Sequence, residues 1–271
     1  MNGAFMDSST NTDLIRGKQV VQNNPSSNQL EEIRLRDAQA ADYHDFIKSH
    51  RGEYWIRAQA GLVMRALQPQ KGHRVYDAGA GVGIYTLELA RRFPEVSIFA
   101  TDFSPASIAL LDSQARQHDF RNIETEVADI SNFKSDKRRF ERAMCLDTIQ
   151  HISSSAERVE TVRNINSMLI AGGIFVLTAY RWGGWIKPPQ PKEDKNYNGT
   201  GLYRMAFTKD EIANLLREAG FRNVRSFGII RMPNKIRKHL PAAFGYTAEN
   251  ILNQLDLAED KAQYLMAVGV K

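Results

Sequence analysis

The sequence predicts a doubly wound α/β fold, in which helices cover both faces of a mostly parallel sheet. Three observations predict it. Short apolar runs alternate with helical patterns from residue 75 onward, a glycine-rich turn follows the first run, and acidic residues stand where three of the runs end. Most connections between the runs are long enough to hold a helix, as parallel neighbours require. The 271 residues fit one such domain with appendages.

The chain before the glycine-rich turn is expected to form an arm and a helical lid. Residues 1–29 are rich in Asn, Ser and Gln and have too few apolar residues to order themselves, so we expect a flexible arm. Apolar residues then recur at helical spacing, and residues 30–68 are expected to form the N-terminal helical lid. Pro69 ends the last of these helices, and residues 69–271 form the core.

Seven strands and five helices are expected in the core, with a loop over 181–203 and an excursion over 231–260 as substrate-side appendages. Gly172 and Gly173 are expected to cap the third helix, and Thr208 with Glu211 forms a capping box for the fourth. The expected strands begin at residue 75 and continue over 96–101, 122–127, 140–146, 174–180, 224–230 and 264–270. The expected helices cover 84–93, 105–118, 156–169, 208–218 and 248–257.

The glycine-rich turn has the form G-x-G-x-G, with glycines at 79, 81 and 83. It is not the dinucleotide fingerprint G-x-G-x-x-G, because Ile84 stands where that pattern needs its third glycine. Glycine lets the backbone turn sharply and lets a ligand approach amides that a Cβ would shield. The turn is therefore interpreted as a cradle for a nucleotide-like ligand.

Asp77, two residues before Gly79, completes a pattern that resembles the first motif of the class I S-adenosylmethionine (SAM) dependent methyltransferases. The resemblance covers about residues 75–221 and the last strand. It implies a Rossmann-like, mostly parallel seven-stranded sheet whose last strand is antiparallel, and it implies SAM as cofactor. In such enzymes the acid reaches the ammonium group of the cofactor.

The resemblance extends to the ends of the next three strands. It implies that Asp102 accepts from the ribose hydroxyls, that Phe103 lies against adenine, and that Asp129 accepts from the adenine amino group. Caps and Asx turns are alternative roles for these two acids. The full set of implied cofactor residues is Asp77, Gly79, Gly81, Gly83, Asp102, Phe103, Asp129, Ile130, Cys145, Leu146 and Gln150.

His151 is the catalytic candidate, because an imidazole titrates near pH ~6.5 and can take a proton from a hydroxyl or amine acceptor. A positioning role at the start of the following helix is the alternative. Cys145 is interpreted as a small strand residue rather than a nucleophile.

Substrate contacts are predicted in two segments. The lid residues lie just before the first motif, and aromatic residues of the loop over 181–203 lack an obvious core. Packing in the core is the alternative for the lid aromatics. The candidates are Tyr54, Trp55, Arg57, Tyr180, Trp182, Trp185 and Tyr203.

Composition limits the classes of partner and site that we expect for this chain. The 36 Lys and Arg against 31 Asp and Glu leave a small basic excess, which permits nucleic acid without favouring it. The single cysteine excludes an intramolecular disulfide and a cysteine-based metal cluster, and we expect no metal. We expect no membrane span and a cytoplasmic protein. The basic run over 231–239 is interpreted as a solvated face, with phosphate binding as the alternative.

The predicted function is transfer of a methyl group from SAM to an oxygen, nitrogen or carbon atom of a small molecule. Residues 147–180 and 202–207 are also similar to methyltransferases that finish modified wobble uridines in transfer RNA, so an RNA substrate is the alternative. A SAM-binding partner protein without catalysis is the second alternative.

Overall fold

The computed structural model describes residues 27–271 apart from 136, 184–190, 197–198, 200 and 238. Most of the predicted N-terminal arm, residues 1–26, therefore lies outside the described residues. The described chain begins with helix α1 at Ser27.

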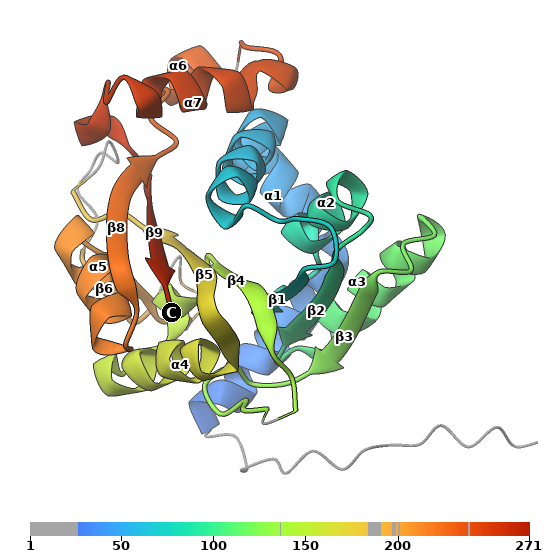
Figure 1. Cartoon of the computed structure of the whole chain (residues 1–271). Coiled ribbons are helices and arrows are strands. Elements are labelled where there is room, and N and C mark those ends of the chain that lie inside the picture. The colour runs from blue at the N-terminus through green and yellow to red at the C-terminus, as the bar shows by residue number, and fades with distance from the viewer. Residues whose placement is uncertain (1–26, 136, 184–190, 197–198, 200, 238) are drawn as a thin grey trace, which may run out of the picture.

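Seven strands form one sheet in the order β3-β2-β1-β4-β5-β9-β8. Strand β9 runs antiparallel to both of its neighbours, and the other pairings are parallel. The predicted mostly parallel sheet with an antiparallel last strand is confirmed (Figure 1). The strands are β1 (Arg74–Ala78), β2 (Ser97–Asp102), β3 (Ile123–Val127), β4 (Phe140–Leu146), β5 (Leu169–Tyr180), β8 (Arg222–Ile229) and β9 (Tyr264–Val270), with a separate two-stranded sheet of β6 (Glu193–Asp194) and β7 (Arg204–Met205).

Helices cover the sheet on both faces, because successive strand residues point to opposite sides. In β4, Ala143 and Cys145 pack in the core under α4 and α5, whereas Met144 and Leu146 pack in the core under α1 and α2. The helices are α1 (Ser27–Leu67), α2 (Ile84–Arg92), α3 (Pro105–Gln117), α4 (Ser155–Met168), α5 (Lys209–Glu218), α6 (Asn234–Arg237) and α7 (Gly245–Gln254), with 3₁₀ turns η1 (Ile149–His151), η3 (Ala242–Phe244) and η4 (Glu259–Lys261).

Helix α1 spans nearly all of the predicted lid, residues 30–68, in one run that is kinked at Gly52. The backbone there has φ 75° and ψ 160°, a conformation that glycine adopts without steric cost. The half after the kink supplies buried residues such as Ala58 and Leu67 to the core against the sheet. Gly52 therefore separates the buried half of α1 from its N-terminal half.

The prediction that Gly172 and Gly173 cap the third helix is wrong. Helix α4 ends at Met168, and Leu169 is already extended and pairs with Phe140 of β4. Leu169 is buried, so its place in the sheet is more favourable than another helical turn. The two glycines lie inside β5 and exchange backbone hydrogen bonds with Lys271.

The capping box of α5 is confirmed. The N–H of Glu211 donates to the Thr208 hydroxyl at 3.2 Å, and the N–H of Thr208 donates to the Glu211 carboxylate at 2.9 Å.

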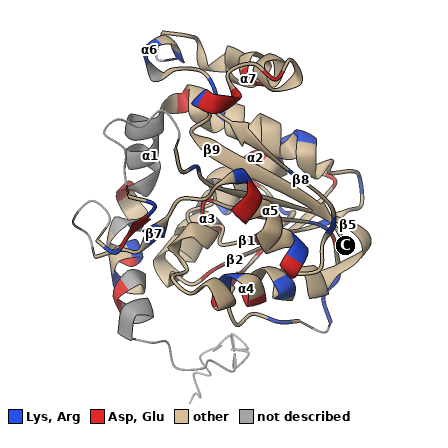
Figure 2. Ribbon diagram, turned by 90° about the vertical axis from the view of Figure 1, so that its left-hand side faces the viewer, with Lys and Arg blue, Asp and Glu red and all other residues tan. Residues whose placement is uncertain are grey.

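The interpretation of residues 231–239 as a solvated face is wrong for both arginines of this segment. Arg231 is 2% exposed and pairs with Asp256 at 3.2 Å and with Glu259. Arg237 is also buried, and its guanidinium lies 4.5 Å from the ring centre of Trp55. Arg231 thus joins the two ends of the excursion, whereas Arg237 joins the excursion to α1, and Figure 2 shows the excursion beside α1.

Candidate functional site

The three acidic residues predicted at strand ends lie at one edge of the sheet. Asp77 is in β1, and Asp102 ends β2, the parallel neighbour of β1. Val127 of β3 pairs with Asp102, and Asp129 follows two residues later. The carboxyl ends of these strands meet beside the glycine turn between β1 and α2, as doubly wound sheets require of a ligand site.

The three glycines of the turn all have positive φ, but they serve different purposes. A Cβ at Gly79 would lie 2.5 Å from the Thr148 side chain, and one at Gly83 would lie 2.2 Å from Leu111. A Cβ at Gly81 would meet nothing within 4 Å. Gly79 and Gly83 therefore permit close packing within the protein, and Gly81 borders open space where a ligand can approach the backbone.

Asp102 fixes the shape of this turn. One carboxylate oxygen accepts from the N–H of Gly81 at 2.9 Å, and the other accepts from the N–H of Ser104 at 3.0 Å. Burial raises the pKa of this carboxyl, and the two backbone donors oppose the rise. A carboxylate held in this way beside Gly81 fits an acceptor for ligand hydroxyls.

Asp77 is buried with one hydrogen bond, accepted from the Thr86 hydroxyl at 2.6 Å. Burial raises the pKa of Asp77 to about 7, and the nearby Asp102 adds to the rise. A buried carboxyl at this position favours the arrival of a positive charge, because an opposite charge stabilises the ionised form. Contact of Asp77 with the ammonium group of SAM stays a prediction.

Asp129 forms an Asx turn, in which its carboxylate accepts from the N–H of Ser131 at 2.9 Å. Ile130 is buried in the core that contains Tyr76, and Phe103 is half-buried after β2. The loop after β3 is therefore held in a fixed shape. Contact of these residues with adenine stays a prediction.

Two predicted cofactor residues at the exit of β4 are used within the protein. The Cys145 side chain is fully buried in the core under α4 and α5, and burial raises the pKa of its thiol. The Gln150 amide donates to the Asp147 carbonyl at 3.2 Å and accepts from the N–H of Tyr180 at 2.9 Å. Leu146 is buried on the opposite face from Cys145. The side chain of Gln150 thus joins the ends of β4 and β5.

His151 is half-buried in the turn after β4, with Nδ1 2.9 Å from the carbonyl oxygen of Tyr203. A carbonyl accepts only, so Nδ1 carries the proton in this contact, and the lone pair of the neutral ring is on Nε2. The Tyr203 backbone therefore orients the imidazole in the tautomer that a base needs.

The predicted substrate residues fall into two groups. Tyr54 and Trp55 are buried: the Tyr54 hydroxyl donates to Glu249 at 3.4 Å, and Trp55 packs edge-on against Tyr264. Arg57 is exposed. The structure therefore favours the core interpretation for the two aromatics of α1.

Of the predicted loop aromatics, Tyr180 is the last residue of β5 and the others follow it in the chain. Tyr180 is half-buried with the Arg204 guanidinium 5.2 Å from its ring centre, and Trp182 is 47% exposed with the Lys192 ammonium 5.5 Å from its ring centre. Tyr203 is half-buried. Trp185 lies outside the described residues.

A buried polar network that was not predicted from the sequence lies at the exit of β4. Gln59 of α1 donates to the Asp147 carboxylate at 3.1 Å and accepts from the Trp55 indole at 2.7 Å, and the Thr178 hydroxyl donates to Asp147 at 2.7 Å. Asp147 has φ 58°, which is uncommon for a residue with a side chain. Its position after a strand is the same signal that identified the three other acids.

Neither a metal-binding cluster nor a membrane-spanning helix is found in the part of the chain that the structure describes. No group of three or more His, Cys, Asp or Glu side chains there can hold a metal ion. No helix in the same part has the length and apolar character needed to cross a membrane.

Comparison with known proteins gives the family of the segment that contains the glycine turn. Residues 75–173 match a family model described as a methyltransferase domain. This segment is a methyltransferase domain. It contains Asp77, the glycine turn, Asp102 and Asp129, so the predicted class I SAM-dependent family is confirmed, with SAM as its cofactor.

Curated relatives match the methyltransferase domain over short segments. (S)-Tetrahydroprotoberberine N-methyltransferase of Eschscholzia californica is 26% identical over 93 residues, which are 34% of this chain and 26% of that protein. Release factor glutamine methyltransferase of Moorella thermoacetica is 34% identical over 55 residues, which are 20% and 19%. The matches span about a quarter or less of these relatives.

Solved structures share the fold over most of the chain. A SAM-dependent methyltransferase from Clostridium acetobutylicum ATCC 824 has a TM-score of 0.60 at 13% identity and covers 86% of this chain and 98% of its own. The [4+2]-cyclase SpnF has a TM-score of 0.57 at 19% identity, with 79% and 81% covered. The Rossmann-like fold is thus confirmed, and a protein with this fold can be named for another reaction.

Proposed function

We propose that this protein transfers a methyl group from SAM to an oxygen, nitrogen or carbon atom of a small-molecule acceptor and releases S-adenosylhomocysteine. One observation carries the proposal: the open space at Gly81 lies beside Asp102, which accepts from the Gly81 N–H, within a segment that also contains Asp77 and matches a methyltransferase domain. N-methyltransferases named for small molecules among the relatives support this class of acceptor.

The residues of the cradle fit the cofactor. Asp77 would hold the ammonium group, and Asp102 would accept from the ribose hydroxyls while keeping its bond to the N–H of Gly81. When bound, SAM supplies an electrophilic methyl group on a sulfonium. The protein supplies alignment and exclusion of water.

His151 would act on the acceptor. Its Nε2 would take the proton that a hydroxyl or amine loses as it gains the methyl group. The carbonyl of Tyr203 would accept from Nδ1–H throughout and would stabilise the charged imidazolium. Tyr180 at the end of β5 and Trp182 two residues later would cover the acceptor.

A second candidate function is cofactor binding without methyl transfer. The cyclase SpnF favours this candidate, because it shows that the fold is not confined to proteins named as methyltransferases.

A measurement of methyl transfer distinguishes the two candidate functions. The whole chain would be incubated with methyl-labelled SAM, panels of small amines, phenols and carboxylates, and bulk transfer RNA, and S-adenosylhomocysteine would be measured by mass spectrometry. We expect product that depends on a small acceptor and is lost in Gly81→Asn. Calorimetric binding of SAM without product from any acceptor would contradict the enzymatic proposal, and label in transfer RNA would support the RNA alternative.

A further inference from the structure

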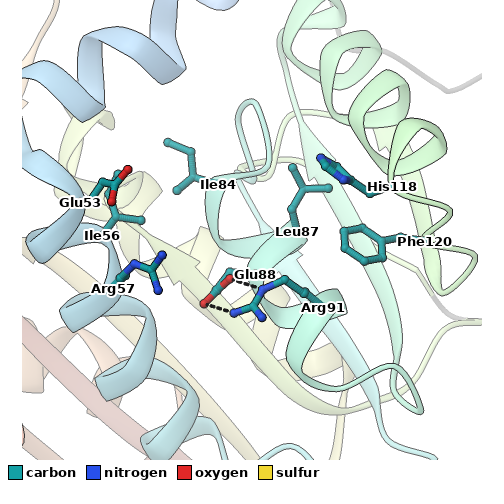
Figure 3. Close-up of a pocket in the computed structure, with 9 residues that line it drawn as sticks. All are labelled: Glu53, Ile56, Arg57, Ile84, Leu87, Glu88, Arg91, His118 and Phe120. Atoms are coloured by element: carbon teal, nitrogen blue, oxygen red, sulfur yellow. Dashed lines mark hydrogen bonds and ion pairs between the residues drawn. The ribbon is translucent and has the colours of Figure 1, made fainter. Parts of the chain in front are cut away.

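A groove separate from the cofactor cradle runs between α1, α2 and the chain after α3 (Figure 3). Its volume is about 380 Å³, within the range of ~300–1,000 Å³ that is typical of small-molecule sites. The lining includes neither the glycine turn nor the three strand-end acids. Apart from the substrate contact predicted for Arg57, no role proposed above uses this groove.

The separation from the cradle follows from the geometry of α2. Ile84, Leu87 and Arg91 line the groove, and their spacing places them on one face of the helix. Thr86, the partner of Asp77, and Leu89 are buried on the other side of α2. A ligand in the groove would therefore contact α2 on the face turned away from the cofactor.

The floor of the groove is apolar and only half-buried. Ile56 comes from α1, Ile84 and Leu87 from α2, and Phe120 from the chain between α3 and β3, and each of these four side chains is partly exposed. A ligand that covered them would gain the free energy of removing apolar surface from water.

The charged side chains at the rim of the groove differ in whether they form ion pairs. Glu88 accepts two hydrogen bonds from Arg91 at 2.9 Å and one from Arg92 at 2.6 Å, so its charge is satisfied within α2. Arg57 is exposed above the apolar floor, and no carboxylate of the described residues pairs with it. Glu53 lies one helical turn before Arg57, and no ion pair joins the two. Of the two arginines that line the groove, Arg57 is thus the one without an ion pair to another lining residue.

We propose that this groove is a second binding site, for an apolar monocarboxylate. The hydrocarbon body covers Ile56, Leu87 and Phe120, and the carboxylate accepts from the Arg57 guanidinium. A planar guanidinium binds a carboxylate through two parallel hydrogen bonds, which neither an alcohol nor an amine can accept in the same way.

Three ligands with the same chain and different head groups test the proposal on the whole protein. Octanoate, 1-octanol and octylammonium would be titrated calorimetrically, below the concentrations at which they self-associate, in saturating S-adenosylhomocysteine. We expect one octanoate per chain, binding of octanol weaker by about tenfold, and no binding of octylammonium.

Two variants and a control assign the contacts. Arg57→Gln should weaken octanoate about tenfold and leave octanol unchanged, because it removes the guanidinium and leaves the apolar floor of the groove in place. Leu87→Ala should weaken both ligands. Arg34→Gln removes an exposed arginine of the same helix outside the groove and should change neither.

Four results would overturn the site. These are no octanoate binding, equal affinity for octanoate and octanol, an Arg57→Gln variant that binds octanoate normally, and loss of octanoate binding when S-adenosylhomocysteine is present. The last result would make the groove part of the cofactor site. None of these readouts requires methyl transfer, so they are independent of the proposed activity.

Discussion

The N–H of Gly81 donates to the Asp102 carboxylate at 2.9 Å and so joins the glycine turn after β1 to the end of β2. Gly81 is the glycine of the turn that borders open space, and Asp102 has its second oxygen bonded to Ser104. The shape of the cradle therefore depends on a contact between two motifs that are 21 residues apart.

Replacing Gly81 by Asn should abolish SAM binding with little loss of stability. Asn tolerates positive φ better than other residues with side chains, and its side chain would enter the space that the ligand needs. Calorimetric titration with S-adenosylhomocysteine measures the affinity, and thermal unfolding measures the stability. Gly72→Asn is the matched control, since Gly72 also has positive φ and open space but lies before β1. Normal affinity in Gly81→Asn would remove the cradle assignment.

Gly83→Ala should instead destabilise the fold. A Cβ there would collide with Leu111 in the packing between α2 and α3 and would also be strained at φ 85°. We expect a loss of about 1–3 kcal/mol in the free energy of unfolding, measured by urea denaturation. A stability equal to that of the wild type would show that Leu111 moves aside without cost.

Replacing Asp102 by Ala should weaken SAM by about 1–3 kcal/mol, because charge-assisted hydrogen bonds to the ribose are lost. The N–H groups of Gly81 and Ser104 also lose their acceptor, so the turn should become more mobile. Asp102→Asn keeps an acceptor and should have the smaller effect. Unchanged affinity in both variants would place the ribose contact elsewhere.

Asp77 should make stability and cofactor binding respond to pH in opposite directions. Burial raises its pKa to about 7 from an ordinary value of 3.8, so the folded chain holds this proton more tightly than the unfolded chain. Its contribution to the free energy of unfolding is therefore greatest below pH 3.8 and declines as pH rises toward 7. Ionised Asp77 favours SAM, so cofactor affinity should rise over the upper part of this pH range.

Asp77→Asn tests both effects. Without SAM, the variant should be more stable than the wild type at pH 8 by roughly 2–4 kcal/mol and about equal to it at pH 4. Its affinity for SAM should fall at least tenfold and should lose the pH dependence that Asp77 causes. Denaturant unfolding and calorimetry at several pH values would measure these changes, and a variant less stable than the wild type at pH 8 would refute the buried charge.

His151→Gln should lower kcat about 10²–10⁴-fold with an oxygen or nitrogen acceptor if His151 is the general base, while SAM affinity stays unchanged. The acidic limb of the pH–rate profile should disappear with it. His239→Gln changes an exposed histidine of the excursion and serves as control. A fall in rate that leaves the acidic limb in place would assign His151 a positioning role.

Residues that follow strand ends could be predicted from the sequence, because strand, turn and helix signals are local. The glycine spacing, the acids at 77, 102 and 129 and the capping box of α5 all depend on neighbouring residues, and the fold they predicted is the observed one. The boundary at α4 was wrong, because pairing of Leu169 with Phe140 outweighed the local signal of two glycines.

Long-range contacts decided the remaining features. Trp55 and Tyr54 have an aromatic pattern that suits either a core or a pocket, and only their packing against Tyr264 and Glu249 distinguishes the two. Local charge patterning predicts that Arg231 is solvated, but the folded chain buries it against Asp256.

The order of elements, the glycine turn and the acids at the strand ends could be predicted from the sequence alone, because each is encoded within a few consecutive residues. Only the tertiary structure decided which glycine borders open space, which His151 tautomer is held, and that α1 and α2 enclose a groove beside Arg57. The physical reason is that these properties depend on side chains from elements distant in the chain, whose contacts form only when the sheet and its helices pack.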